Sequence, residues 1–274
     1  MIDLHTHSNA SDGTDSPGLL VDIALNEGIS TLALCDHDTT SGIQHFLSHA
    51  DRLSVMAIPG IEISAEWKVG HCHILGLNLK VNCKDFENML EKLRDGRDSR
   101  NIKICQKLRE LGIPIDITEV SEFAKGEVIA RPHIAQVLVK KGYCKSIDDA
   151  FNRLLAKGAP AYIERFRLPP SEAVTMLKNS GARVFLAHPA QLNLDLPSLR
   201  DFASELKEYG LDGLEVYTPY ASDEAITAFA GLCKELKLKT SGGSDYHGAN
   251  KPGHRMGYYR ADKPIPDSVY EAIE

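Results

Sequence analysis

Met1-Ile2-Asp3-Leu4-His5-Thr6-His7-Ser8 begins the chain, combining a short apolar run with two histidines that one residue separates. Successive side chains of a β-strand point to opposite faces, so the strand predicted here presents His5 and His7 on the same face. Zinc, iron and manganese accept imidazole and carboxylate ligands, and Asp12 supplies a carboxylate nearby. One such pair is a weak indication of a metal site, but related patterns recur along the whole chain.

Short apolar segments alternate with amphipathic ones along most of the sequence. Strands are predicted at residues 2–4, 31–35, 55–59, 72–77, 183–187, 213–217 and 239–241. Amphipathic helices are predicted at residues 17–28, 170–181 and 195–210. This alternation predicts an α/β fold with parallel strands and outer helices. About seven strands that end in polar clusters favour a barrel, whose active site lies at the carboxyl ends of its strands.

The alternation stops between about residues 100 and 160, where helical patterns occupy residues 101–111, 131–141 and 147–156. We interpret this stretch as a helical insertion that caps the barrel mouth; the alternative is a set of ordinary barrel helices. The interpretation divides the chain into three parts: barrel at 1–99, cap at 100–160 and barrel again at 161–274.

The composition narrows the class of protein. A formal net charge of −7 argues against a surface for duplex DNA, although bound metals would still allow a small anion to bind. The six cysteines form no C-x-x-C pair, which argues against a zinc ribbon and suits a reducing compartment. We find no signal peptide and no apolar run of membrane-spanning length, so we expect a cytoplasmic protein without membrane contact.

Imidazoles and carboxylates accompany the predicted strands repeatedly. The motifs are Asp36-His37-Asp38-Thr39, Gly60-Ile61-Glu62, His73 in the strand at 72–77, Ala187-His188-Pro189 and Asp245-Tyr246-His247. Each alone has a structural explanation, such as a hydrogen-bonded histidine at the barrel rim or a salt-bridged glutamate. Together they place ligands on one face of the barrel, which predicts a site for more than one metal ion.

This set of motifs resembles the PHP (polymerase and histidinol phosphatase) family of metallophosphoesterases over essentially the whole chain. The resemblance is greatest to the stand-alone bacterial branch of 3′,5′-nucleoside bisphosphate phosphatases, some of which are also 5′-to-3′ exoribonucleases. It implies a distorted (β/α)7 barrel, the PHP fold, holding three divalent metal ions. Mixed imidazole and carboxylate ligands suit manganese, iron or zinc better than magnesium or calcium, and we expect manganese or iron, with zinc as the alternative.

The resemblance also implies which residues bind each metal. The sets are His5, His7, Glu62 and Asp245; Glu62, His73 and His188; and Asp12, His37 and His247, with Glu62 bridging the first two. His71 lies on the same strand face as His73 and is an alternative ligand, but the Ile-Leu-Gly that follows His73 favours His73.

The predicted cap carries Ala130-Arg131-Pro132-His133, where proline suits the first turn of a helix. Arginine offers two parallel donors to a phosphate, and the resemblance suggests that Arg131 and His133 contact the substrate's phosphates. The alternative is an ordinary helix start on the surface. Arg165 and Arg167 are candidates for a second phosphate, with a solvated face as the alternative.

Three further positions are candidates for supporting roles. Asp36 and Asp38 flank His37 and would orient ligands or carry a proton, so Asp36 joins Arg131 and His133 as a candidate catalytic residue. Related sequences have a histidine near residues 215–220, where this chain has Tyr220. The role of that histidine is therefore in doubt here.

The expected function is hydrolysis of the 3′-phosphate of a nucleoside 3′,5′-bisphosphate by a hydroxide that bridges metals, with stepwise 5′-to-3′ digestion of short RNA as a related activity. The expected partners are a small nucleotide or a short RNA, and the oligomeric state is left open. The alternatives are a histidinol phosphatase and a non-catalytic metal-binding module.

Overall fold

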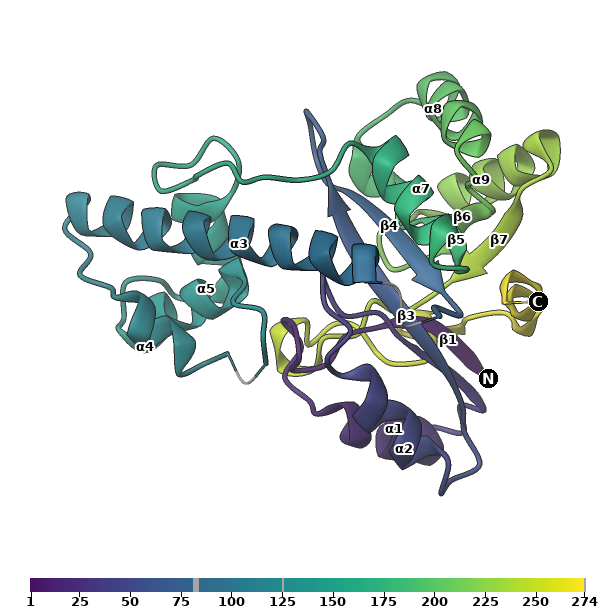
Figure 1. The fold of residues 1–274 in the computed structure, drawn as a ribbon, viewed down its shortest axis with the longest axis horizontal. Helices are drawn as coiled ribbons and strands as arrows, with labels where there is room; N and C mark the ends of the chain where they lie inside the picture. The colour runs from purple at the N-terminus through teal and green to yellow at the C-terminus, as the bar shows by residue number, and fades with distance from the viewer. Residues whose placement is uncertain (81–83, 125, 274) are drawn as a thin grey trace.

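A computed structural model describes residues 1–80, 84–124 and 126–273. Its centre is a seven-stranded sheet whose spatial order follows the sequence. The strands are β1 (Ile2–Thr6), β2 (Thr31–Leu34), β3 (Met56–Ala65), β4 (Cys72–Leu77), β5 (Arg183–Leu186), β6 (Gly213–Tyr217) and β7 (Lys239–Gly242). The sheet curls into a barrel wall with helices outside it (Figure 1), so the predicted α/β barrel is confirmed.

The prediction of an all-parallel sheet is wrong at β4, which runs antiparallel to both β3 and β5. The reason is the connection of residues 66–71 between β3 and β4, since a parallel crossover needs a dozen or more residues. As a result, the first residues of β4, and not its last, lie beside the end of β3, where His73 pairs with Ser64.

The strand β3 also differs from its prediction, which ended at residue 59. It continues to Ala65 because residues 60–65 pair with β4, and Glu62 lies opposite Leu75 within this ladder. Glu62 is therefore held in the middle of a paired strand and not on a loop after it.

The two outer strands of the sheet meet at the barrel mouth. Thr6 at the end of β1 forms a parallel bridge with Tyr246, which follows β7. Below it, the buried Asp3 carboxylate accepts hydrogen bonds from the Ser244 amide at 3.0 Å and hydroxyl at 2.6 Å, and from the Gly257 amide at 2.7 Å. Asp3 thus ties β1 to the segment that carries Asp245 and His247.

Helices cover the outside of the sheet in two groups (Figure 1). They are α1 (Pro17–Asn26) and α2 (Ile43–Ala50) on one side, and α7 (Pro170–Asn179), α8 (Leu196–Glu208) and α9 (Asp223–Leu236) on the other. Smaller elements are η2 (Pro189–Leu192), η3 (Gly248–Asn250), β8 (Tyr258–Arg260), β9 (Lys263–Pro264) and η4 (Asp267–Ala272). Within the described residues, every helix is too short or too polar to cross a membrane.

A long helix precedes the smaller helices of the predicted cap. The helix α3 (Lys84–Glu110) projects away from the barrel beside the smaller cap elements (Figure 1). These are α4 (Ile117–Ser121), α5 (Arg131–Lys140), α6 (Ile147–Ala150) and the π-helix η1 (Phe151–Leu155). Leu90, near the start of α3, belongs to the apolar core between the sheet and α7, α8 and α9. Leu108, near its end, belongs to a separate apolar cluster with residues of α5 and η1.

The predicted boundary between residues 99 and 100 therefore falls inside one continuous helix. The separate apolar cluster supports a cap with its own small core, and the division into three parts stays a prediction. Residues 84–100 escaped the prediction because this stretch is rich in charged side chains and its apolar positions are few.

Candidate metal and phosphate site

The fold brings all nine predicted metal ligands together at the barrel mouth. Donor atoms of eight of them form three overlapping groups, and within each group the atoms lie within 4.8 Å of one another. The groups are His5, His7, Glu62 and Asp245; His7, Asp12, His37 and His247; and His37, Glu62 and His73. The first group is the predicted set, and the second is the predicted set of Asp12, His37 and His247 with His7 added. The third contains His37 in place of the predicted His188, which lies in none of the groups but has its Nε2 atom 2.9 Å from Oε1 of Glu62.

The first group has the spacing expected around a single ion. The Nε2 atoms of His5 and His7 lie 3.0 Å apart, and Oε2 of Glu62 and Oδ1 of Asp245 each lie 3.3 Å from His7 Nε2. Two ligands bound at about 2.1 Å and at a right angle are separated by about 3 Å. These four donor atoms therefore fit a transition-metal ion.

Glu62 connects this group to the next through its two oxygens. Oε1 lies 2.9 Å from Nδ1 of His73 and 2.9 Å from Nε2 of His188, while Oε2 lies 3.1 Å from Nδ1 of His37. Burial opposes ionisation of Glu62, but the surrounding imidazoles outweigh it and hold the pKa of this carboxyl well below its usual range. An ionised carboxylate with one oxygen on each side is suited to bridging two ions.

The histidine nitrogens also fit metal binding. Nδ1 of His7 and Nδ1 of His37 are buried and make no hydrogen bond within the described residues, although Nδ1 of His37 lies 3.1 Å from Oε2 of Glu62. Buried polar atoms are normally partnered, so these nitrogens are available to an ion. His71 makes no such approach to Glu62 and lies on the cavity wall, which supports His73 as the ligand of the two.

The backbone at the site is strained at three ligand-bearing loops. Asp38, His188 and Asp245 have positive φ angles of 54°, 28° and 50°. Such conformations cost roughly 1–3 kcal/mol each in residues other than glycine and persist where neighbouring contacts impose them. Here they turn the chain sharply after β2, β5 and β7, so that the side chains face the common centre.

Glu215 is a supporting residue that sequence reasoning missed. It lies within β6, is fully buried, and its Oε1 lies 2.9 Å from Nδ1 of His5 while its Oε2 accepts the His188 amide at 2.7 Å. A carboxylate on the second ring nitrogen fixes the tautomer and orientation of a ligating histidine. The one available signal was an acidic residue in an otherwise apolar strand.

Asp36 has a positioning role in this structure. Its carboxylate accepts hydrogen bonds from the Ser8 amide at 2.9 Å, the Ser8 hydroxyl at 2.6 Å and the Ser11 hydroxyl at 2.5 Å. These bonds fix the loop that carries Asp12. Of the two roles that the sequence left open, orientation is the one these contacts support.

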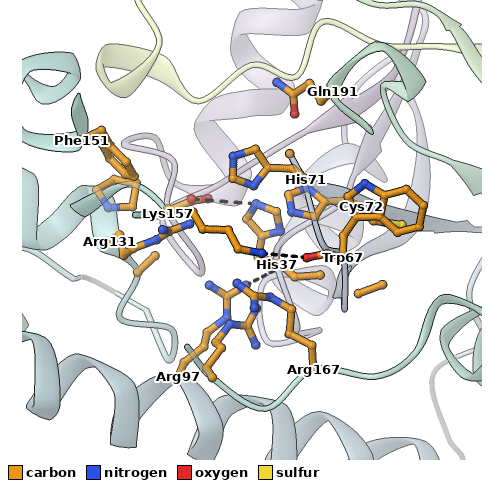
Figure 2. A pocket seen from close by; sticks show the side chains of 18 of the residues that line it. His37, Trp67, His71, Cys72, Arg97, Arg131, Phe151, Lys157, Arg167 and Gln191 are labelled. Carbon is orange, nitrogen blue, oxygen red and sulfur yellow. Dashed lines mark hydrogen bonds and ion pairs between the residues drawn. The ribbon is translucent and has the colours of Figure 1, made fainter. Parts of the chain in front are cut away.

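A cavity of about 360 Å³ adjoins the ligand cluster, and five arginines, here called the arginine wall, line it; Figure 2 labels Arg97, Arg131 and Arg167. The arginines are Arg97, Arg100, Arg131, Arg165 and Arg167. Asp38 links the two regions, because its Oδ2 accepts from Arg97 Nε at 2.8 Å and from Arg165 Nη2 at 3.2 Å. Burial opposes its ionisation, yet these arginines hold the pKa of Asp38 at about 2.

Arg97 and Arg100 come from α3 and were not predicted, because the sequence gave no reason to expect that helix at the site. Their signal was the three-residue spacing of Arg94, Arg97 and Arg100, which places arginines along one helix face. The structure also brings Arg131, Arg165 and Arg167, which the sequence did single out, to the same wall.

The five arginines of the wall carry more positive charge than their acidic partners, Asp38 and Glu164, neutralise. Arg100 Nη2 and Arg165 Nε are buried without a hydrogen-bond partner in the described part of the chain. Burial and repulsion from neighbouring arginines lower the pKa of Arg165 to about 9 and of Arg131 to about 10. Unpartnered guanidinium donors in a buried cavity are the expected features of an anion site.

His133 differs from Arg131 in its placement. It is buried with 3% of its surface exposed, and residues 130–132 line the cavity next to it while His133 itself does not. Its Nδ1 accepts the Ala130 amide at 3.0 Å, so the neutral ring carries its proton on Nε2. This bond caps the start of α5, and a direct role of His133 at the substrate stays a prediction.

Comparison with known proteins agrees with this geometry. The PHP domain family matches residues 3–101. The 5′-3′ exoribonuclease Rnm of Escherichia coli is 33% identical over 247 residues, covering 89% of this chain and 84% of the relative. The chain belongs to the PHP family. The predicted family is thereby confirmed.

Two further PHP-type relatives extend over nearly the full length. The 3′,5′-nucleoside bisphosphate phosphatase of Chromobacterium violaceum is 28% identical over 274 residues, which are 100% of this chain and 96% of that protein. A solved structure from Bifidobacterium adolescentis, assigned as a metal-dependent phosphoesterase, has a TM-score of 0.89 at 26% identity and covers 99% of this chain and 94% of its own. The similarity therefore extends over the barrel strands and over residues 100–160 alike.

Glu215→Gln tests the supporting role of this buried carboxylate. The change removes the negative charge from the His5 ring while keeping the side-chain size. We expect the affinity for manganese at the tightest site to fall about ten-fold or more, as observed for partners of metal-bound histidines. Titration calorimetry on the metal-stripped protein measures this. Affinity within two-fold of the parent protein would remove Glu215 from the metal centre.

Proposed function

We propose that this PHP-family chain is a metal-dependent phosphoesterase acting on nucleotides that carry a 5′-phosphate and a phosphate ester at the 3′ oxygen. Its substrates are nucleoside 3′,5′-bisphosphates and, by the same step, the 5′ end of short RNA. The observation that carries the proposal is the pairing of two anion sites in one cavity, the ligand cluster and the arginine wall.

The arrangement assigns one phosphate to each site. The arginine wall would hold the 5′-phosphate through charge-assisted hydrogen bonds, which fixes the nucleotide and presents its 3′-phosphate to the ligand cluster. Water adds to phosphorus, the bond to the 3′ oxygen breaks, and a proton from the water ends on that oxygen. A bisphosphate and an RNA differ only in what else is attached to this phosphorus.

The metal centre that we propose contains three divalent ions, manganese or iron by preference. When bound, such ions activate water and offset charge on the phosphoryl oxygens. The residues of the chain hold the site in shape: Glu62 joins the groups, Glu215 orients His5, and Asp36 fixes the loop of Asp12. The fixed geometry reduces the reorganisation that the reaction requires.

The positive charge of the cavity disfavours the alternative function of a histidinol phosphatase. Histidinol phosphate carries one phosphate and an ammonium group, and the arginine wall would repel the ammonium while leaving its own donors without an anion. The second alternative, a metal-binding module without activity, predicts no turnover of any phosphate ester. Hydrolysis of an aryl phosphate by metal-loaded protein would exclude it.

Glu62→Gln tests whether Glu62 bridges two metal ions. The parent protein, reconstituted with manganese, should bind more than one equivalent, because its ligand set exceeds the need of one ion. The neutral amide weakens the bridge, so at least one equivalent should be lost, together with most of the activity. Elemental analysis after gel filtration gives the count. One ion or fewer in the parent protein, or an unchanged count in the variant, would contradict the bridged centre.

Arg131→Ala tests the assignment of the arginine wall. A charge-assisted contact contributes roughly 1.5–3 kcal/mol, so kcat/KM for adenosine 3′,5′-bisphosphate should fall about ten- to a hundred-fold. Hydrolysis of 4-nitrophenyl phosphate, which lacks a second phosphate, should change by less than about three-fold.

Arg200→Ala is the matched control, since Arg200 is exposed on α8 and pairs with Glu235. It should leave both substrates unaffected. If Arg131→Ala lowered kcat/KM equally for both substrates, Arg131 would act on the phosphoryl group being cleaved. No loss with either would return histidinol phosphate to consideration.

A further inference from the structure

A lysine on another wall of the same cavity has no role in the proposal so far. Lys251 follows β7, and its ammonium donates to Asp245 Oδ2 and, at 2.8 Å, to the hydroxyl of Tyr220. Tyr220 in turn donates to the same Asp245 oxygen. Both Lys251 and Tyr220 line the cavity next to the ligand cluster.

The two oxygens of Asp245 have separate partners. Oδ1 lies 3.3 Å from His7 Nε2 and 3.4 Å from His247 Nδ1, and so faces the metal ligands. Oδ2 is taken by Tyr220 and Lys251. The carboxylate therefore holds the ammonium next to the ligand cluster without using the oxygen that is available to an ion.

The ammonium keeps a donor for a substrate. It carries three N–H groups, and the contacts with Asp245 and Tyr220 use two of them. Its side chain is 34% exposed, so the third N–H can meet a group in the cavity. The centroid of the Tyr220 ring lies 5.6 Å from the ammonium nitrogen.

Lys251 and the arginines belong to different parts of the barrel. Lys251 and Tyr220 follow β7 and β6, whereas Arg97 and Arg165 are anchored through Asp38 and Ser64, next to β2 and on β3. A nucleotide whose 5′-phosphate lies on the arginines would therefore present its leaving 3′ oxygen toward them. The phosphoryl oxygens that face away would point to Lys251.

We propose that Lys251, held by Asp245 and Tyr220, binds the terminal oxygen of the scissile phosphate and favours phosphate monoesters over diesters at this site. This inference rests on the proposed function. In a 3′-phosphate monoester this oxygen carries negative charge, and it attracts an ammonium. In RNA the same position is an uncharged ester oxygen that joins the phosphate to the next nucleotide, so its electrostatic attraction to the ammonium is much weaker.

The test compares two substrates on manganese-loaded protein: adenosine 3′,5′-bisphosphate and the 5′-phosphorylated dinucleotide pApA. Lys251→Gln removes the charge but keeps an amide that can donate to Asp245. It should lower kcat/KM for the bisphosphate about ten-fold or more and change that for pApA by less than about three-fold. Lys251→Arg keeps the charge and should retain most of the preference for the bisphosphate.

Two controls make the result specific. Lys234→Gln, an exposed lysine on α9, should leave both rates unchanged, and elemental analysis should show the parent metal content in Lys251→Gln. Equal losses with both substrates, a loss of metal, or no change would overturn the inference and make Lys251 a support for Asp245. A parent protein that cleaves neither substrate would overturn the proposed function itself.

Discussion

The buried carboxylate of Glu62 is the interaction on which the site depends. Five imidazoles surround it, from His5, His7, His37, His73 and His188, and they come from four strands or their ends. A carboxylate without solvent needs such partners, since an isolated buried charge costs several kcal/mol. Its position is fixed by the β3–β4 ladder, so the reversal of β4 is part of how the fold builds the metal centre.

The ligands were predictable because each lies in a short motif that follows the local rules of strands. His5 and His7 share a face by alternation, and the other motifs accompany apolar runs that the sequence shows directly. The direction of β4 was missed because periodicity carries no information on direction, although the short connection after Ala65 did. Glu215 was missed because its partner His5 lies 210 residues away in the sequence, and only the curling of the sheet brings the two together.

Charge divides the cavity into parts with separate tasks. Asp38 anchors Arg97 and Arg165 next to the strand that holds Glu62, and Asp245 anchors Lys251 on another wall. Each carboxylate positions basic side chains without neutralising the positive charge of the whole cavity. The remaining positive charge attracts a ligand with two phosphates. The helix α3 was the least predictable contributor, because its arginines matter through their place in space and not through a recognisable motif.

The central claim is that the arginine wall retains the 5′-phosphate while the ester at the 3′ oxygen is hydrolysed. The most direct measurement is chromatographic identification of the nucleotide formed from adenosine 3′,5′-bisphosphate by the manganese-loaded protein. The account predicts adenosine 5′-monophosphate together with inorganic phosphate. Formation of adenosine 3′-monophosphate would contradict it, because the two phosphates would then occupy each other's sites.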